Sequence, residues 1–280
     1  MSLISEAKLI GRVEEILRST QDNSAKIRQT LRILAKFRSL QMQSYLIEAE
    51  GLQVLGGPFK GMTFLPASAE GCHIPKILGC YEADLHPHIL AAAKRGYAAV
   101  INIGSAEGYY AVGLARLMPQ AVVHAHDLNP DAQTACRNLA ATNNVADRVV
   151  VGGEFKGEDF AAFAARRTLI FCDIEGGEKD LLDPDRFPAL RRMDIIVELH
   201  DRAKLMMSEI VPRRFAESHE ITMIKAGPRE VELPDALRGL SHLDQLLAIW
   251  EWRTAPTPWA VMRAWEGIAP APPAAVSTGR

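Results

Sequence analysis

A chain of 280 residues, 48% hydrophobic and 24% charged, has the composition of a globular protein, which excludes a disordered or fibrous one. This length accommodates one α/β domain with a smaller attachment, but not three independent cores. The formal charge of −2 provides no general attraction to a phosphate backbone, so nucleic acid is a disfavoured partner.

Neither a secretory signal nor a membrane span is expected. The N-terminal segment carries charges throughout, and no later run approaches the roughly 20 apolar residues of a span. The four cysteines form neither a CxxC pair nor a cluster with the spacing of zinc ligands. We therefore expect reduced, structural thiols in a cytoplasmic protein.

Residues 4–50 are predicted to form two amphipathic helices, because apolar residues recur at helical spacing on both sides of a polar break at residues 21–24. Ile33, Phe37, Leu40 and Ile47 need a surface to cover them. This predicts that the N-terminal helices form a homodimer interface or cap the functional site. A Gly-rich segment, residues 51–61, is expected to form a hairpin.

From residue 97, short apolar runs alternate with helical segments, which is typical of βαβ units and a mostly parallel sheet. Five strands are predicted: AAVINIG, AVVHAHD, RVVVGG, TLIFCDIE and MDIIVELHD. Residues 109–117, 131–141 and 160–166 are predicted helices. EITMIKAG and DQLLAIWEWR are expected to pair as antiparallel edge strands. Residues 256–280 are expected to form a Pro-rich tail whose end is unpacked, which leaves 51–255 as the main domain and 1–50 as a helical extension.

The turn after the first strand has the features of a cofactor site. In VINIGSAEGYYAVGLA, a strand, a turn with glycines and a helix direct backbone N–H groups at a ligand. The spacing Gly104-x-x-x-Gly108 differs from the G-x-G-x-x-G of dinucleotide sites, and Glu107 suits an amino group better than a diphosphate. This pattern favours S-adenosylmethionine over NAD. Asp127, at the end of the second strand, stands where a carboxylate binds ribose hydroxyls; its alternative role is to cap the helix at Pro130.

Five ordered motifs resemble those of FkbM-type and neighbouring class I methyltransferases: YEADLHPHI, VINIGSAEGYYAVGLA, HDLNPDAQTACRNLAATNNV, FCDIEGGEKDLL and IIVELHD. The resemblance covers residues 79–201. It implies a Rossmann-like seven-stranded sheet with helices on both faces and a terminal antiparallel strand. It also implies methyl transfer from S-adenosylmethionine, usually to an oxygen of a small-molecule or sugar-like acceptor.

By this resemblance the loop with Glu107 holds the methionine end of the cofactor, Asp127 the ribose, and Gly153 with Glu154 the adenine. Glu82 either closes over the cofactor or is an ordinary helix-surface residue. The expected cofactor contacts are Glu82, Asn102, Gly104, Ser105, Ala106, Glu107, Gly108, Tyr109, Asp127, Leu128, Gly153, Glu154 and Asp173.

Acidic residues and a histidine end two neighbouring strands, at the edge where open α/β sheets bind ligands. Asp173 and Glu175 share one face of an extended segment, as do Glu198 and His200. His200 is the candidate general base, with Asp173 or Glu175 orienting it or contacting the acceptor. Alternatively, these four side chains hold Mg²⁺, or they form an ordinary ion-pair cluster with Lys179, Arg191 and Arg192.

Two other functions stay open at this point. One is an NAD-dependent oxidoreductase, which the missing middle glycine and the absence of a Tyr-x-x-x-Lys signature disfavour. The other is a non-catalytic scaffold that retains the fold and interacts through its N-terminal helices. The Asn-Pro-Pro-Tyr motif of resembling amino-methylating enzymes is replaced by DIEG, which disfavours the exocyclic amines of nucleic acid as acceptors.

Overall fold

The computed structural model describes residues 5–68, 71–202, 205–227, 231–255 and 257–267. They form two compact units, one comprising Met1–His86 with Gly227–Ala255 and the other Pro87–Ala226 with Pro256–Arg280. Residues 51–86 and 227–255 group with the N-terminal helices in this division, which breaks after residues 86, 226 and 255, whereas the predicted boundaries lie at residues 50 and 255. The units are called the helical unit and the sheet unit below.

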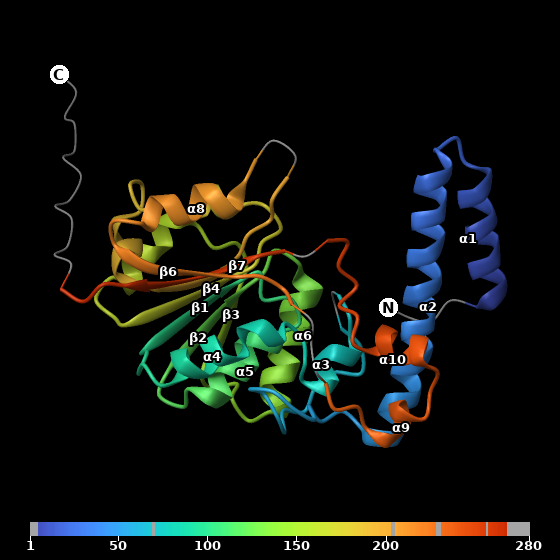
Figure 1. Ribbon diagram of the computed structural model, residues 1–280. Helices are drawn as coiled ribbons and strands as arrows, with labels where there is room; N and C mark the ends of the chain where they lie inside the picture. Colours follow the sequence, from blue (N-terminus) through green and yellow to red (C-terminus); the bar gives the residue numbers. More distant parts are fainter. Residues whose placement is uncertain (1–4, 69–70, 203–204, 228–230, 256, 268–280) are drawn as a thin grey trace. The chain divides into compact units, whose positions relative to one another are not determined.

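The sheet unit contains a seven-stranded, mostly parallel sheet in the order β3-β2-β1-β4-β5-β7-β6 (Figure 1). β1 to β5 pair in parallel, whereas β7 is antiparallel to both β5 and β6. This confirms the predicted Rossmann-like fold with its antiparallel strand. The strands are β1 Ala99–Ile103, β2 Val122–His126, β3 Val149–Gly152, β4 Thr168–Cys172, β5 Asp194–Glu198, β6 His219–Ile224 and β7 Trp259–Ala264.

The central strands are apolar because helices cover both faces of the sheet. Every residue of β1, β4 and β5 is buried. Figure 1 shows α8 (Met207–Phe215) on one face, with α5 (Tyr109–Leu117) and α6 (Pro130–Thr142) on the other. Under α8, Met207, Val211 and Phe215 pack into a core that includes β4 and β5. The remaining elements of this unit are α4 His86–Ala93, η2 Gly157–Phe163, α7 Glu178–Leu181 and η3 Pro188–Arg192.

The edge of the sheet corrects one strand prediction. EITMIKAG contains β6 as expected, but its antiparallel partner is β7 and not DQLLAIWEWR. The latter begins as α10 (His242–Ala248), because the Ser241 hydroxyl accepts the Asp244 backbone N–H and caps a helix. β7 lies near the start of the segment predicted to be a C-terminal tail with an unpacked end, so the part of this segment that pairs with the sheet was not predicted. Prolines bracket WAVMRA without interrupting it, so this short run can enter the interior of the sheet.

The helical unit is built around the long helix α2 (Asn23–Glu50), which follows α1 (Glu6–Arg18) as predicted. Two Arg38 guanidinium nitrogens donate to the Asp244 carboxylate, at 2.7 and 2.8 Å, and tie α2 to α10. The predicted hairpin is present as a bridge between Gln53 and Thr63. The other helices of this unit are α3 Ile74–Leu78, η1 Ala83–Leu85 and α9 Asp235–Arg238.

The apolar side of the N-terminal helices is only partly covered within the chain. Ile33 and Phe37 are half-buried, whereas Ile27, Leu31 and Leu34 remain exposed along α2. A homodimer through these helices therefore stays a prediction. None of the helices that the structure describes combines the length and apolar character needed to cross a lipid bilayer.

The turn after β1 generates a prediction about stability. Gly104 has φ +75°, and a Cβ there would stand 1.6 Å from the Asp173 carbonyl oxygen; Gly96 has φ +70° but open space around the same position. Gly96→Ala should lower the free energy of unfolding by about 1–2 kcal/mol, the cost of a left-handed backbone for an L-residue. Gly104→Ala should cost distinctly more, because the backbone of two strand ends must also move. Urea denaturation of both variants measures this, and equal losses would contradict the close approach.

Candidate functional site

The loop between β1 and α5 is a tight backbone turn anchored on β2. Gly104, Ala106 and Gly108 all have positive φ values, of 75°, 45° and 94°. The Gly104 and Ser105 backbone N–H groups donate to the His126 carbonyl oxygen at 2.9 and 3.0 Å. The loop thus lies at the carboxyl ends of β1 and β2. This is the edge at which open α/β sheets bind nucleotide-like ligands.

Asp127 joins this loop directly to the end of β2. One carboxylate oxygen accepts the Ala106 backbone N–H and the other accepts that of Asn129, both at 2.8 Å. The cap of α6 is Asn129, whose side chain accepts the Asp131 N–H, so the alternative role of Asp127 as the helix cap is not what the structure shows. Each oxygen keeps a lone pair, which leaves the half-buried carboxylate able to accept two hydroxyl groups.

Several predicted cofactor residues place polar atoms around the turn. Among the described residues, the Asn102 Oδ1 and Ser105 Oγ atoms are buried without a hydrogen-bond partner. Glu107 is fully buried and Tyr109 nearly so. Burial, Glu107 and Asp127 together raise the pKa of the Cys136 thiol to about 12. Unsatisfied buried polar atoms are costly, so they fit a loop that binds a polar ligand.

The other predicted cofactor contacts, Leu128 and the adenine-contacting Gly153 and Glu154, follow the ends of β2 and β3. Leu128 is 76% exposed directly after Asp127. The Gly153 carbonyl oxygen is within 3.0 Å of His126 Nδ1 and so belongs to the same edge. Glu154 is exposed and lies 3.7 Å from Lys156. An apolar side chain beside these polar groups suits a heteroaromatic base.

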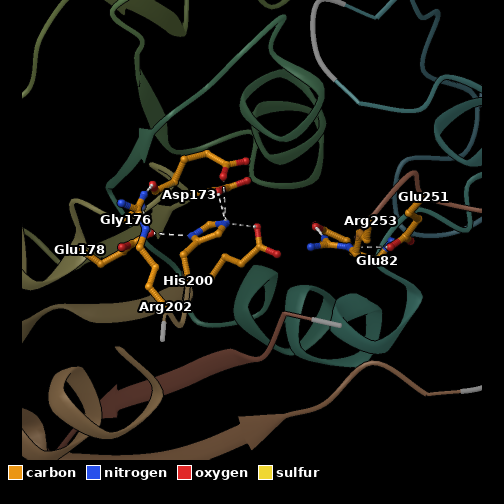
Figure 2. Close-up of polar contacts among 10 residues, drawn as sticks. Glu82, Asp173, Gly176, Glu178, His200, Arg202, Glu251 and Arg253 are labelled. Atoms are coloured by element: carbon orange, nitrogen blue, oxygen red, sulfur yellow. Dashed lines mark hydrogen bonds and ion pairs between the residues drawn. The ribbon is translucent and has the colours of Figure 1, made fainter. Parts of the chain in front are cut away.

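Glu82 belongs to the helical unit, where its side chain is buried beside a cation. Its carboxylate pairs with Arg253, and its backbone N–H donates to Glu251 Oε1 at 2.6 Å (Figure 2). Arg253 Nε also donates to Glu251 at 3.0 Å. Glu82 is buried, so it is not a helix-surface residue. Its contact with a cofactor stays a prediction.

The second group of predicted residues comes together around the His200 imidazole. Nδ1 lies 2.7 Å from Glu178 Oε1, and Nε2 lies on the other side of the ring, 3.5 Å from Glu198 Oε2 and 3.7 Å from both Asp173 Oδ1 and Glu175 Oε2 (Figure 2). The ligand atoms of Asp173, Glu175 and His200 lie within 4.8 Å of one another. The group is called the His200 cluster below.

Two groups of the His200 cluster, the His200 imidazole and the Asp173 carboxyl, have raised pKa values. Burial disfavours the imidazolium, but the Glu178 hydrogen bond and the charges of Glu198 and Asp173 outweigh it and raise the pKa of His200 to about 9. Burial and the neighbouring Glu198 carboxylate raise the pKa of Asp173 well above its usual range. His200 is therefore protonated near neutral pH, a state in which it cannot accept a proton from an acceptor hydroxyl.

Sequence reasoning missed two residues of this neighbourhood. Glu178, fully buried at the start of α7, orients His200, and the Arg202 guanidinium donates to the Glu175 carbonyl oxygen at 2.7 Å. The acidic motif that contains Glu178 gave no indication that the side chain would turn inward. Two of the three cations expected to neutralise the cluster pair elsewhere, since Lys179 lies 3.3 Å from Asp180 and Arg191 lies 2.5 Å from Asp185. The third, Arg192, lines a cavity at the other edge of the sheet.

No protein-family model matches the chain, and no curated protein matches it by sequence. Solved structures with a similar fold include the O-methyltransferase TomG from Streptomyces achromogenes, involved in tomaymycin synthesis, in complex with SAM. It is 13% identical, with 93% of this chain and 99% of that one covered and a TM-score of 0.42. An O-methyltransferase from Bacillus cereus in complex with SAH is 15% identical, with coverages of 91% and 97% and a TM-score of 0.41.

A human methyltransferase 10 domain-containing protein is 10% identical, with coverages of 82% and 96% and a TM-score of 0.46. These three neighbours are methyltransferases by name. Since their identities and TM-scores are low, the functional proposal rests on the residues of this chain.

The proton affinity of the His200 cluster predicts a pH dependence of stability. In a metal-free buffer, the folded chain binds protons at His200 and Asp173 more tightly than the unfolded chain, so stability falls as the pH rises. The contribution of His200 is complete below about pH 6.5, the pKa of an unfolded histidine, and is lost as the pH passes about 9.

His200→Gln should therefore flatten the fall of Tm between these two pH values, measured by circular dichroism. His88→Gln is the matched control, because burial and Arg263 lower the pKa of His88 and remove it from this range. The same slope in His200→Gln and the unaltered protein would contradict the assignment.

Proposed function

We propose that the chain is an S-adenosylmethionine-dependent methyltransferase of the FkbM-like kind that methylates an oxygen of a small-molecule or sugar-like acceptor. The observation that carries the proposal is the bond between Asp127 and the Ala106 N–H, which joins a ribose-type carboxylate to a glycine turn at the carboxyl edge of the sheet. When bound, the cofactor supplies an electrophilic methyl group on a sulfonium centre.

The loop residues fit this cofactor better than a dinucleotide. Glu107 occupies the turn where a diphosphate would need a neutral or positive surface, and its negative charge suits the amino group of a methionine moiety. Asp127 offers two oxygens to the ribose hydroxyls, and Leu128 offers an apolar surface to the base. Asn102, Ser105 and Tyr109 line the same turn.

The His200 cluster is the proposed acceptor site. The Asp173 backbone N–H donates to the Ile103 carbonyl oxygen at 2.9 Å, so the cluster begins one residue from the cofactor loop. Methyl transfer requires the acceptor oxygen to be aligned with the methyl group and to lose its proton. As a general base, His200 accepts that proton at Nε2. It can do so only in its neutral form, so the imidazole must first lose the proton that the surrounding carboxylates stabilise.

The geometry of the cluster also fits a divalent cation. His200 Nε2 and oxygens of Asp173, Glu175 and Glu198 face one region, while Nδ1 is held by the buried Glu178 carboxylate. A carboxylate behind a histidine in this manner is the arrangement that orients metal-binding imidazoles. An ion such as Mg²⁺ would position acceptor oxygens and favour their deprotonated form. A cation bound there is the alternative to His200 acting as a base, because Nε2 cannot coordinate an ion and accept a proton at once.

The cofactor assignment predicts the outcome of a binding experiment. The unaltered protein should bind S-adenosylmethionine or S-adenosylhomocysteine in calorimetry, whereas NAD should not bind. Asp127→Ala should weaken binding by about a hundredfold or more, because two hydrogen bonds to a charged acceptor are worth roughly 1.5–3 kcal/mol each.

Asp131→Ala removes the same charge from an exposed position four residues away and is the matched control. Asp127→Asn, which retains an acceptor, should keep the loop folded. NAD binding at comparable affinity, or unchanged S-adenosylmethionine affinity in Asp127→Ala, would overturn the assignment. Binding of the cofactor without turnover on any acceptor in a screen would instead support a scaffold.

The two modes of acceptor activation predict different responses to chelation. If the cluster binds a cation, activity should vanish with EDTA and return with added Mg²⁺ or Mn²⁺, and Mn²⁺ should raise Tm in the unaltered protein but not in His200→Ala. If His200 acts only as a base, EDTA should have no effect, while His200→Ala should lose about 10²–10⁴-fold in rate with its cofactor affinity unchanged. Full turnover in His200→Ala and indifference to EDTA would exclude both roles.

A further inference from the structure

A cavity of about 390 Å³ lies at the edge of the sheet opposite to the cofactor loop. Its lining includes Thr168 and Asp194, the first residues of β4 and β5, and Ala264, the last residue of the antiparallel β7. These positions mark the amino ends of the parallel strands, whereas Gly104 and Asp127 follow the carboxyl ends. The cavity is therefore separated from the proposed catalytic edge by the length of the central strands.

The lining of this cavity is strongly basic. Four arginines, Arg95, Arg166, Arg167 and Arg192, stand against two carboxylates, Asp194 and Glu266. A chain with a formal charge of −2 has no overall excess of positive charge, so this concentration is local. Guanidinium groups bind phosphate oxygens through paired, charge-assisted hydrogen bonds.

One arginine and one carboxylate of the lining neutralise each other. Arg95 Nε donates to Asp194 Oδ2 at 2.7 Å, and the Tyr97 hydroxyl donates to the same oxygen at 2.5 Å. The Ala264 backbone N–H donates to Asp194 Oδ1 at 2.9 Å. Asp194 is thereby fully engaged in holding the strand ends together. Its charge is compensated within the wall of the cavity and does not repel a bound anion.

The other arginines keep their charge available to a ligand. Arg167 lies 3.9 Å from Glu266, whose side chain is 90% exposed, and such a pair is weak in water. Arg166 and Arg192 are exposed, and among the described residues neither forms an ion pair. Trp265 is half-exposed on the same lining and offers an aromatic face beside the cations.

We propose that this cavity binds the phosphate groups of a small phosphorylated ligand of about nucleotide size. The volume lies within the range of small-molecule sites, roughly 300–1,000 Å³. Three arginines with unpaired or weakly paired guanidinium groups match the several oxygens of a diphosphate better than the single charge of a carboxylate. The site assigns a second ligand to the chain, independent of S-adenosylmethionine.

Calorimetry of the full chain with inorganic pyrophosphate, in a phosphate-free buffer of low ionic strength, tests the proposal. Pyrophosphate should bind, and the double variant Arg166→Gln/Arg192→Gln should weaken binding by about tenfold for each arginine removed. Arg191→Gln is the matched control: it removes the same charge beside Arg192, from a side chain paired with Asp185 outside the cavity lining. Its affinity should equal that of the unaltered protein.

Further measurements separate this site from the proposed cofactor site. Asp127→Ala should leave pyrophosphate binding unchanged even though it weakens S-adenosylmethionine binding. ADP that binds more tightly than pyrophosphate, with the difference lost in Trp265→Ala, would identify a ligand that carries a base; equal affinities would identify recognition of the phosphates alone.

Absence of pyrophosphate binding would overturn the proposal, as would equal affinity in the double variant and the Arg191→Gln control. Equal Tm values of all variants exclude unfolding as the cause of a loss.

Discussion

The contact on which both proposed sites depend is the backbone approach between Gly104 and Asp173. The Asp173 N–H donates to the Ile103 carbonyl oxygen, and a side chain at Gly104 would stand 1.6 Å from the Asp173 carbonyl oxygen. Parallel pairing of β1 with β4 brings these two strand ends together. Paired residues such as Asn102 and Phe171 are 69 positions apart in the sequence. The glycine turn after β1 and the His200 cluster therefore meet at one backbone junction.

The two edges of the sheet, at the carboxyl and amino ends of the parallel strands, carry side chains of opposite charge. At the carboxyl edge, the carboxylates of Asp173, Glu175, Glu178 and Glu198 surround one imidazole. Like charges at this spacing repel one another. This repulsion favours the protonated forms of His200 and Asp173 and contributes to their raised pKa values. A cation or a positively charged sulfonium at this edge would relieve the repulsion, which links stability to ligand binding.

At the amino edge the charge is reversed, and arginines surround the cavity. Asp194 serves as the fixed point of that edge, since it binds Arg95, Tyr97 and the Ala264 backbone at once. Burial and Asp194 together raise the pKa of Tyr97 far above its usual range, so the phenol remains a hydrogen-bond donor. A protein with almost no net charge thus presents a negative site and a positive site at opposite ends of the same strands.

The order and type of the central elements could be predicted from the sequence, because each depends on local patterns. The apolar runs that became β1 to β5, the glycines at 104 and 108 and the acidic residue at 127 follow the rules of buried strands, left-handed turns and open α/β edges. The two N-terminal helices were equally visible from their spacing. Each of these features is determined by residues only a few positions apart in the sequence.

Long-range packing decided the rest. Whether WAVMRA or DQLLAIWEWR pairs with β6 depends on which one reaches the sheet interior, and local propensity does not contain that information. Glu178 became the partner of His200 because α7 places it, fully buried, beside the end of β5. The arginine cavity gathers residues from before β1, before β4, before β5 and after β7. Residues so distant in sequence share a surface only once the sheet has brought their strand ends to one edge.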